Sequence, residues 1–488
     1  MEQTMKLGED NKRLMLIGGE LTASQTGEWL PSINPATEEV IGYTPAAAAS
    51  DVDAAAKAAT QAWPAWNALG VEARGEALRE VARQLKARSD EILAVEVADT
   101  GNTISALKGD VDAAVWSLNH YAGLGYELKG ETIPATPGNL HLTVREPFGV
   151  VGRIVPFNHP IMFAAARTAA ALMAGNAVVV KPPETSPLSA TIFAEICQQV
   201  LPPGVMNVVT GLGRDAGDAI ARHPDIKRIA FIGSPGTARQ IQKSAADVCV
   251  KHISLELGGK NPMIVFPDAD LERAKDAAVR GMNFAWQGQS CGSTSRLLVH
   301  DSLYDEFVES VVARVRQIRL GNPALETSTM GPINSKAQYD KVCNYVEVAK
   351  ADGARLVHGG RRPEGAEFQR GYWLEPTVFA DVTSQMRIAQ EEVFGPILSI
   401  MRWSDAKQAL DIANSVEYGL TASIWTADIG TAMQTARQVR SGYIWINGVG
   451  THFRGVPFGG YKNSGVGREE SLDEMLSYTE TKVINIML

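Results

Sequence analysis

Short strand-like runs alternate with helical stretches through the middle of this sequence. Between Gly149 and Leu255 the runs GVVGRIV, NAVVVK, MNVVTG, IKRIAFIG and KHISLEL are separated by helical text such as FAAARTAAALMAG. This alternation is typical of a parallel, doubly wound sheet. A second series follows Gly258, with PMIVF, SRLLVH, ARLVHGG, ILSIMRW, TASIWT and YIWING. The sequence therefore predicts an α/β protein with two doubly wound domains.

Length and composition agree with this prediction. The 488 residues exceed the roughly 250 to 300 at which one hydrophobic core stops growing. A content of 45% hydrophobic and 21% charged residues is that of a soluble globular protein. The net charge of −9, with no dense Lys/Arg run, argues against a nucleic-acid partner. The N-terminus has no signal-peptide core and no segment approaches ~18 apolar residues, so we expect a cytoplasmic protein without a membrane partner.

Helices are predicted before the first series, and two segments fit neither series. Ser50 is a capping residue ahead of helical text, and a helical pattern over 72–98 ends at Gly101. LHLTVR at 140–145 alternates apolar and polar residues, and the C-terminal TKVINIML is strand-like. Exposed edges of this kind need a partner.

Four cysteines lie far apart without a C-x-x-C pair, so we expect neither a disulfide framework nor a bound metal. Cys197 and Cys343 lie in helical text and Cys249 precedes a strand, as small core residues do. Cys291 instead stands in FAWQGQSCGSTSR, among small and polar residues in a predicted loop. Its thiol is the candidate nucleophile.

A carboxylate stands at the end of another predicted strand. Glu256 in LELGGKNP comes shortly before Gly258 and Gly259, whose flexible backbone leaves room for water. A carboxylate in that position is suited to act as a general base, although the same residue could be a helix cap or a surface acid.

ELGGKNP, followed further along the chain by GQSC, resembles the paired signature of the aldehyde dehydrogenase superfamily, in its NAD(P)-dependent, hydrolytic branch. The resemblance spans nearly the whole chain. Its further motifs are INPATEEVIG near the start, VPFNHP at 155–160, VVVKPPETSP at 178–187, FIGSPG at 231–236, EEVFGPIL at 391–398 and PFGGYKNSGVGRE at 457–469.

The resemblance implies an architecture of three parts. Residues 1–123 and 147–257 would form an NAD-binding, Rossmann-like domain, and residues 258–459 a catalytic domain. Residues 124–146 and 460–488 would form a small β oligomerisation element and the C-terminal tail. This arrangement explains the two unassigned strands and implies a homo-oligomer, either a homodimer or a homotetramer.

The resemblance also assigns the catalytic residues. The Cys291 thiolate would attack the aldehyde, and the Asn158 side-chain amide, with the Cys291 backbone N–H, would stabilise the oxyanion. Transfer of hydride to the nicotinamide leaves a thioester, which water activated by Glu256 hydrolyses to the carboxylic acid.

Cofactor contacts are implied in the same way. Lys181 and Glu184 would hold the adenosine ribose, and the Glu184 carboxylate would repel a 2′-phosphate, so NAD is expected rather than NADP. Ser234 would contact the pyrophosphate at a helix N-terminus, and Glu391 the nicotinamide ribose. Further expected contacts are Val155, Pro156, Phe157, Gly211, Gly233, Leu257 and Phe394, with no role for Val393. TGLGRDAG at 210–217 imitates a dinucleotide fingerprint but has the wrong spacing, so we interpret it as a strand-to-helix turn.

The aldehyde pocket departs from the usual family pattern. Phe157 stands where the family usually has tryptophan, His159 where it has another aromatic ring, and Ala238 where glycine is common. The expected pocket residues are His159, Phe163, Ala166, Ser290, His452 and Phe458, with Arg454 near the mouth. Ala166 leaves room for a ring, and the histidines or Arg454 could meet a hydroxyl or a carboxylate.

Two other functions are compatible with the fold. A coenzyme-A-acylating relative would pass the thioester to a thiol, and such enzymes tend to lack the base that Glu256 supplies. A non-catalytic relative would have lost Cys291, Glu256 or Asn158, and all three are present.

Overall fold

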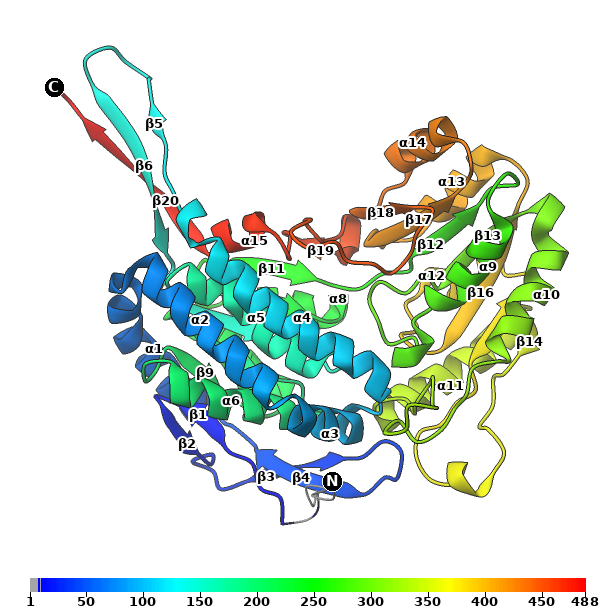
Figure 1. Ribbon diagram of the computed structural model, residues 1–488, viewed down its shortest axis with the longest axis horizontal. Coiled ribbons are helices and arrows are strands. Elements are labelled where there is room, and N and C mark those ends of the chain that lie inside the picture. Colours follow the sequence, from blue (N-terminus) through cyan, green and yellow to red (C-terminus); the bar gives the residue numbers. More distant parts are fainter. Residues whose placement is uncertain (1–7, 9) are drawn as a thin grey trace.

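Two α/β bodies, each built on a mainly parallel sheet, lie beside each other in the computed structural model, and a β-arm projects from the first body (Figure 1). The structure describes residue 8 and residues 10–488. The predicted fold class, two doubly wound α/β units with a small β element, is confirmed. No helix in the described part of the chain combines the length and the apolar character that a membrane span requires.

The first sheet has the strand order β19-β11-β10-β7-β8-β9-β1-β2. Strands β7 to β11 pair in parallel, and β1, β2 and β19 run antiparallel at the two edges. The bounds are β1 (Met15–Ile17), β2 (Glu20–Thr22), β7 (Val150–Ile154), β8 (Ala177–Lys181), β9 (Met206–Val208), β10 (Ile226–Ile232), β11 (His252–Glu256) and β19 (Gly465–Val466). The predicted C-terminal tail thus contributes a strand to this sheet.

Both faces of the first sheet are buried, which is why its strands are continuous apolar runs. In β8, Val178 and Val180 belong to the core beneath α2 to α6, whereas Ala177 and Val179 face the core beneath α1, α7 and α8. The helices are α1 (Ala49–Ala68), α2 (Gly70–Ala87), α3 (Ser89–Thr100), α4 (Ile104–Gly123), α5 (Pro160–Met173), α6 (Leu188–Val200), α7 (Asp218–Arg222), α8 (Pro235–Ala246) and the short α15 (Leu472–Leu476).

The first helices differ in detail from the sequence expectation. Helix α1 begins at Ala49, so Ser50 lies inside its first turn, and the Asp51 carboxylate accepts the Ala48 N–H at 2.8 Å instead. The pattern over 72–98 forms two helices because Arg88 adopts ψ 18° between α2 and α3. Gly101 ends α3 with φ 77°, a left-handed conformation that glycine adopts without strain.

The second sheet has the order β14-β15-β16-β13-β12-β17-β18, parallel except for β14. Its strands are β12 (Pro262–Val265), β13 (Arg296–His300), β14 (Arg355–His358), β15 (Thr377–Ala380), β16 (Ile397–Trp403), β17 (Thr421–Trp425) and β18 (Tyr443–Ile446). Its helices are α9 (Leu271–Arg280), α10 (Tyr304–Val315), α11 (Lys336–Ala351), α12 (Arg387–Gln390), α13 (Ala406–Asn414) and α14 (Ile429–Gln438). Alternate residues of β13 again face opposite cores, so this sheet is also covered on both sides.

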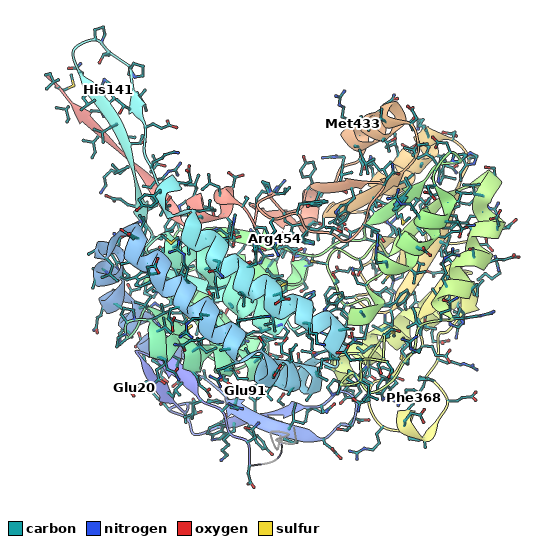
Figure 2. All side chains as sticks on the ribbon, viewed as in Figure 1. Glu20, Glu91, His141, Phe368, Met433 and Arg454 are labelled. Carbon is teal, nitrogen blue, oxygen red and sulfur yellow. The ribbon has the colours of Figure 1, made fainter. Side chains whose placement is uncertain are left out.

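The two unassigned strands pair with each other in the arm. Strand β6 (Leu140–Pro147) pairs antiparallel with β20 (Thr479–Ile486), from Thr479 opposite Pro147 to Ile486 opposite Leu140, and β5 (Thr132–Ile133) lies on the other side of β6. His141 marks the part of the arm that extends away from both bodies (Figure 2). A separate hairpin, β3 (Trp29–Ile33) with β4 (Val40–Pro45), lies below the first body.

Candidate active site

A cavity of about 390 Å³ lies between the two bodies. Helices α4 and α5 and the end of β11 form its wall in the first body, and the loop before β13 and the segment after β18 form the opposite wall. Cys291 and Glu256 both line it. The pocket residues expected from the sequence line it as well, namely His159, Phe163, Ala166, Ser290, His452 and Phe458, together with Arg454.

Hydrogen bonds to its backbone hold the loop that carries Cys291. The Asn261 amide donates to the backbone carbonyls of Cys291 at 2.7 Å and Ser293 at 2.9 Å, while its own oxygen accepts the Thr421 N–H at 3.0 Å. Ser293 N–H also donates to the Ser290 carbonyl, which tightens the turn around the thiol. The thiol therefore lies in a loop, as predicted, and these hydrogen bonds hold the loop in place.

Glu256 is fixed by its place at the end of β11. It pairs with Ile232 of β10 on one side and Gly465 of β19 on the other, and its carboxylate accepts the Gly258 N–H at 3.2 Å. Gly258 has φ 69°, and a Cβ there would lie 2.3 Å from the Glu392 carboxylate, so no larger residue fits this turn.

Burial controls the protonation of both reactive groups. It raises the pKa of Glu256 to about 8, with the nearby carboxylates Glu469 and Glu392 acting in the same direction. Burial and the charge of Glu256 raise the pKa of the Cys291 thiol well above its ordinary value. The thiol therefore keeps its proton at neutral pH, whereas the Glu256 carboxyl exchanges its proton close to neutral pH.

Asn158 is buried beside the cavity, just before α5. Its backbone carbonyl accepts the Asn102 amide at 2.9 Å, and its side-chain oxygen has no hydrogen-bond partner among the described residues. Asn158 is not itself among the residues that line the cavity in the described part of the chain, so the oxyanion role stays a prediction.

The expected cofactor residues gather at the carboxyl edge of the first sheet. Strand β7 pairs with β8 on one side and β10 on the other, so the chain reverses its winding between β7 and β10. Doubly wound proteins bind their ligands outside such a switch point. Three strands are each followed directly by expected residues: β7 by Val155, Pro156 and Phe157, β10 by Gly233 and Ser234, and β11 by Leu257. Lys181 is the last residue of β8, and Glu184 comes three residues later.

Local contacts at this edge suit a nucleotide. The Glu184 carboxylate accepts one backbone N–H, from Gly213 at 2.8 Å, which places the turn TGLGRDAG beside it. That turn leads from β9 into α7, as interpreted from its spacing, and Gly211 there has φ 136°. Burial lowers the pKa of Lys181 to about 8, and its ammonium donates to the Pro182 carbonyl. Ser234 caps α8 by accepting the Thr237 N–H at 3.2 Å.

Neighbouring glutamates in EEVFGP have different surroundings. Arg387 and Tyr345 both bind the half-exposed Glu391 carboxylate. Glu392 instead accepts the Gly259 N–H at 2.9 Å, beside the turn that follows Glu256. Burial raises its pKa to about 7.

The loop containing Glu392 also meets the first body. The Phe394 ring packs edge-on against Phe157 with centroids 5.7 Å apart, and Val393 is buried in the core of the second body. Residues of both bodies therefore meet at the carboxyl edge of the first sheet.

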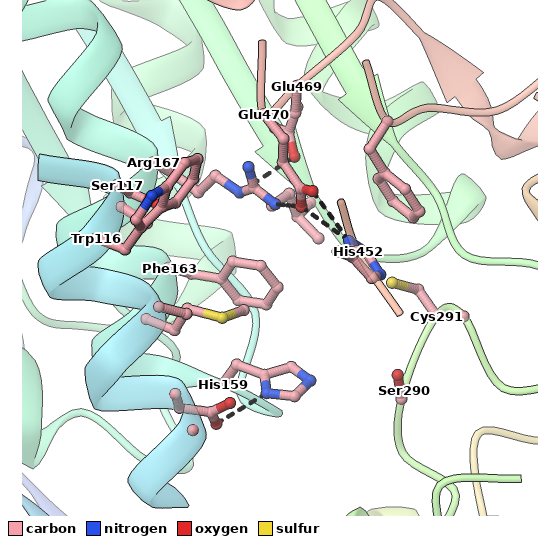
Figure 3. Close-up of a pocket in the computed structure, with 18 of the residues that line it drawn as sticks. Trp116, Ser117, His159, Phe163, Arg167, Ser290, Cys291, His452, Glu469 and Glu470 are labelled. Atoms are coloured by element: carbon pink, nitrogen blue, oxygen red, sulfur yellow. Dashed lines mark hydrogen bonds and ion pairs between the residues drawn. The ribbon is translucent and has the colours of Figure 1, made fainter. Parts of the chain in front are cut away.

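Charged residues that the sequence analysis did not select form one wall of the cavity. Arg167 donates to Glu470 at 2.7 Å and lies near Glu469 at 3.3 Å, and Glu470 also binds His452 (Figure 3). Arg167 could have been noticed, because it is the one charge in the apolar helix PIMFAAARTAAALM. Its carboxylate partners lie far away in sequence and had no local signal. Asp110, Trp116 and Trp286 were missed for the same reason.

No group of His, Cys, Asp and Glu side chains in the described residues could hold a metal ion. The site contains a thiol, a buried carboxylate and the polar side chains at the carboxyl edge of the first sheet.

The chain is similar to known aldehyde dehydrogenases over nearly its whole length. The model of the aldehyde dehydrogenase family matches residues 21–484. Aldehyde dehydrogenase tropH of Talaromyces stipitatus is 45% identical over 464 residues, covering 94% of this chain and 90% of that protein. Peroxisomal aminoaldehyde dehydrogenase 1 of Pisum sativum is 39% identical over 470 residues, covering 94% and 92%. The NAD+ complex of an aldehyde dehydrogenase from Bacillus cereus matches with a TM-score of 0.96 at 36% identity, covering 100% of this chain and 99% of that one.

The hydrogen bonds of Asn261 predict a stability effect. Asn261→Ala removes the partners of two buried carbonyls and one N–H, so the free energy of unfolding should fall by about 2–4 kcal/mol. Urea-induced unfolding measures this change. Asn119→Ala, which loses one exposed hydrogen bond to Val115, should change it by less than about 0.5 kcal/mol. Equal stability of the two variants would contradict the anchoring role.

Proposed function

The chain belongs to the aldehyde dehydrogenase family, and we propose that it oxidises an aldehyde to the carboxylic acid through a thioester on Cys291, with NAD as the hydride acceptor. The observation that carries the mechanism is that Cys291 and Glu256 line one cavity from opposite bodies.

Acylation begins at the thiol. The Cys291 thiol loses its proton to solvent as the sulfur attacks the aldehyde carbon, and burial of the thiol opposes this ionisation. The carbonyl oxygen becomes an oxyanion, to which the Cys291 backbone N–H and the Asn158 amide donate. Loss of hydride from the carbon then leaves the thioester.

Deacylation uses Glu256 as the base. The Glu256 carboxylate accepts a proton from water, the resulting hydroxide attacks the thioester carbon, and the C–S bond breaks to release the carboxylic acid and the Cys291 thiolate, which takes the proton back from Glu256. A base in contact with the cavity favours hydrolysis over transfer of the acyl group to coenzyme A.

The nucleotide edge is suited to NAD. When bound, NAD supplies the acceptor for the hydride that leaves the substrate carbon. Glu184 is available to accept hydrogen bonds from ribose hydroxyls, and its charge disfavours a 2′-phosphate. Ser234 stands at the N-terminus of α8, where a pyrophosphate is favoured. The contact with the nicotinamide ribose, which was expected of Glu391, fits Glu392 better. Glu391 is already bound by Arg387 and Tyr345, whereas Glu392 lies beside the turn that follows Glu256.

The arm offers a surface for self-association. Val483 is 55% exposed and Ile486 41% exposed on β20, which is an edge strand of its sheet. An exposed apolar edge of this kind is covered when a second copy pairs with it. We expect a homodimer or homotetramer held by these arms.

Cysteine and glutamate variants test the mechanism. Cys291→Ala should form no NADH from NAD and any aldehyde, because no thioester can form. Glu256→Gln should keep a first-turnover burst of NADH while its steady-state rate falls by about 10²- to 10⁴-fold. Stopped-flow absorbance at 340 nm measures both phases.

The half-buried Cys249, outside the cavity, provides the matched control. Cys249→Ala should retain the full rate. Undiminished turnover by Cys291→Ala would refute the assignment of the nucleophile.

The raised pKa of Glu256 predicts the pH dependence of turnover. Only the ionised carboxylate accepts a proton, so the steady-state rate should fall as the pH drops below about 8, the pKa that burial confers. A pH profile of kcat checks this. A rate that stays constant from pH 9 down to pH 6 would assign the base to another group.

A substitution on the arm tests association. Val483→Asp places a charge on the exposed edge and should shift the chain to a smaller species in sedimentation velocity. Ile429→Asp replaces a residue that is 68% exposed on α14, outside the arm, and should not. An unchanged sedimentation coefficient for Val483→Asp would argue against assembly through β20.

A further inference from the structure

Two imidazoles, each anchored by a carboxylate, line the aromatic part of the cavity. We infer that the preferred substrate is a hydroxylated aromatic aldehyde, whose O–H donates to the Nε2 atom of His452 or His159. This inference rests on the proposed oxidation at Cys291 and names the substrate class for that same site.

His452 is oriented by a buried charge pair. Its Nδ1 lies 3.1 and 3.0 Å from the two oxygens of Glu470, which Arg167 holds at 2.7 Å. Burial opposes ionisation of Glu470, but His452 and Arg167 lower its pKa to about 2. A carboxylate in this state can only accept, so Nδ1 carries the proton that it donates.

His159 repeats the arrangement on the other wall. Its Nδ1 lies 2.9 Å from Asp110, and its ring packs edge-on against Phe163 and beside Trp286, with centroids 5.5 and 5.4 Å away. Carboxylate and rings together fix the orientation of the imidazole. His452 and His159 both line the cavity that Cys291 enters (Figure 3).

The tautomer decides what the cavity can bind. A neutral imidazole that donates at Nδ1 has a lone pair at Nε2, and neither Nε2 has a hydrogen-bond partner among the described residues. The His159 side chain is 12% exposed and that of His452 is 38% exposed. A ligand that covers these two acceptors satisfies them best with a hydroxyl donor. A carbonyl or ether oxygen cannot make this bond.

The walls between the histidines suit a flat ring. Trp116, Phe163, Trp286, Phe453 and Phe458 present aromatic surface, and the small side chain of Ala166 leaves space beside them. Aromatic side chains stack on or pack edge-on against an aromatic ligand. A cavity of about 390 Å³ is large enough for a single substituted ring.

Most charges of the walls are paired within the protein, whereas Glu256 and Arg454 have no ion-pair partner among the described residues. Asp110 binds His159, Glu470 binds His452 and Arg167, and Asp112 binds Lys86 at 2.7 Å. Arg454 lies over the Trp116 ring, 5.0 Å from its centroid, on an exposed segment. A neutral hydroxyl therefore matches the enclosed part of the cavity better than a second carboxylate or an ammonium group.

Matched aldehydes test the inference. The kcat/KM values for 2-, 3- and 4-hydroxybenzaldehyde are compared with those for benzaldehyde, the corresponding methoxybenzaldehydes and 4-formylbenzoate. At least one hydroxy isomer should exceed both benzaldehyde and its own methoxy counterpart by about tenfold or more, since a site built to bond a hydroxyl discriminates against analogues that lack it.

Histidine variants locate the contact. The ratio of kcat/KM for the preferred hydroxybenzaldehyde to kcat/KM for benzaldehyde should fall to about 1 in His452→Phe or in His159→Phe. Both variants keep an aromatic ring but lose the hydrogen-bond acceptor. His300→Phe, at the end of β13 and outside the cavity, should keep the wild-type ratio. A ratio near 1 for every isomer in the wild type would overturn the inference, as would a ratio retained in both variants.

A preference for 4-formylbenzoate over every hydroxybenzaldehyde would also overturn it and indicate recognition by Arg454. These outcomes differ from a failure of the proposed function. If the proposed function were wrong, no aldehyde of the panel would yield NADH. If only the substrate class were wrong, benzaldehyde itself would still be oxidised by the Cys291-dependent route.

Discussion

The chain crosses from the first sheet to the second between β11 and β12, and the site depends on this crossing. Glu256 ends a parallel strand of the first sheet and Pro262 begins a strand of the second, so the carboxylate belongs to one body and the Cys291 loop to the other. Asn261 lies in this crossing and bonds the backbone of the Cys291 loop at 2.7 Å and 2.9 Å. Because the buried Asn261 side chain bonds the main chain of this loop, the Cys291 loop keeps a fixed position relative to the end of β11.

Two kinds of buried carboxylate result from the charges around the cavity. Glu469 lies 2.6 Å from Arg153 and near Arg167, and the two arginines outweigh burial and lower its pKa. Glu470 stays ionised for a similar reason. Glu256 has no bonded cation in the described structure, so burial dominates and raises its pKa to about 8. Paired carboxylates can orient neighbouring groups, while the unpaired one can exchange protons near neutral pH.

Much of the fold was predictable because its causes are local or periodic. Apolar runs such as NAVVVK indicated strands buried on both faces, and the alternation with helices indicated parallel winding. The helix boundaries were less predictable. Asp51, rather than Ser50, bonds the start of α1, since the choice depends on which side chain the surrounding turn brings within reach.

The sequence by itself determined the family and the α/β architecture, and it selected Cys291 and Glu256 as the candidate reactive pair, because these features lie in contiguous motifs and repeating hydrophobic patterns. Only the tertiary structure decided the partners of Arg167 and the orientation of His452. Glu470 lies far from Arg167 in the sequence, and it is not at a helical spacing from His452. The tertiary structure also distinguished Glu392 from Glu391, which are adjacent in the chain but differ in burial. Burial and long-range pairing arise from packing between elements, and no local pattern specifies them.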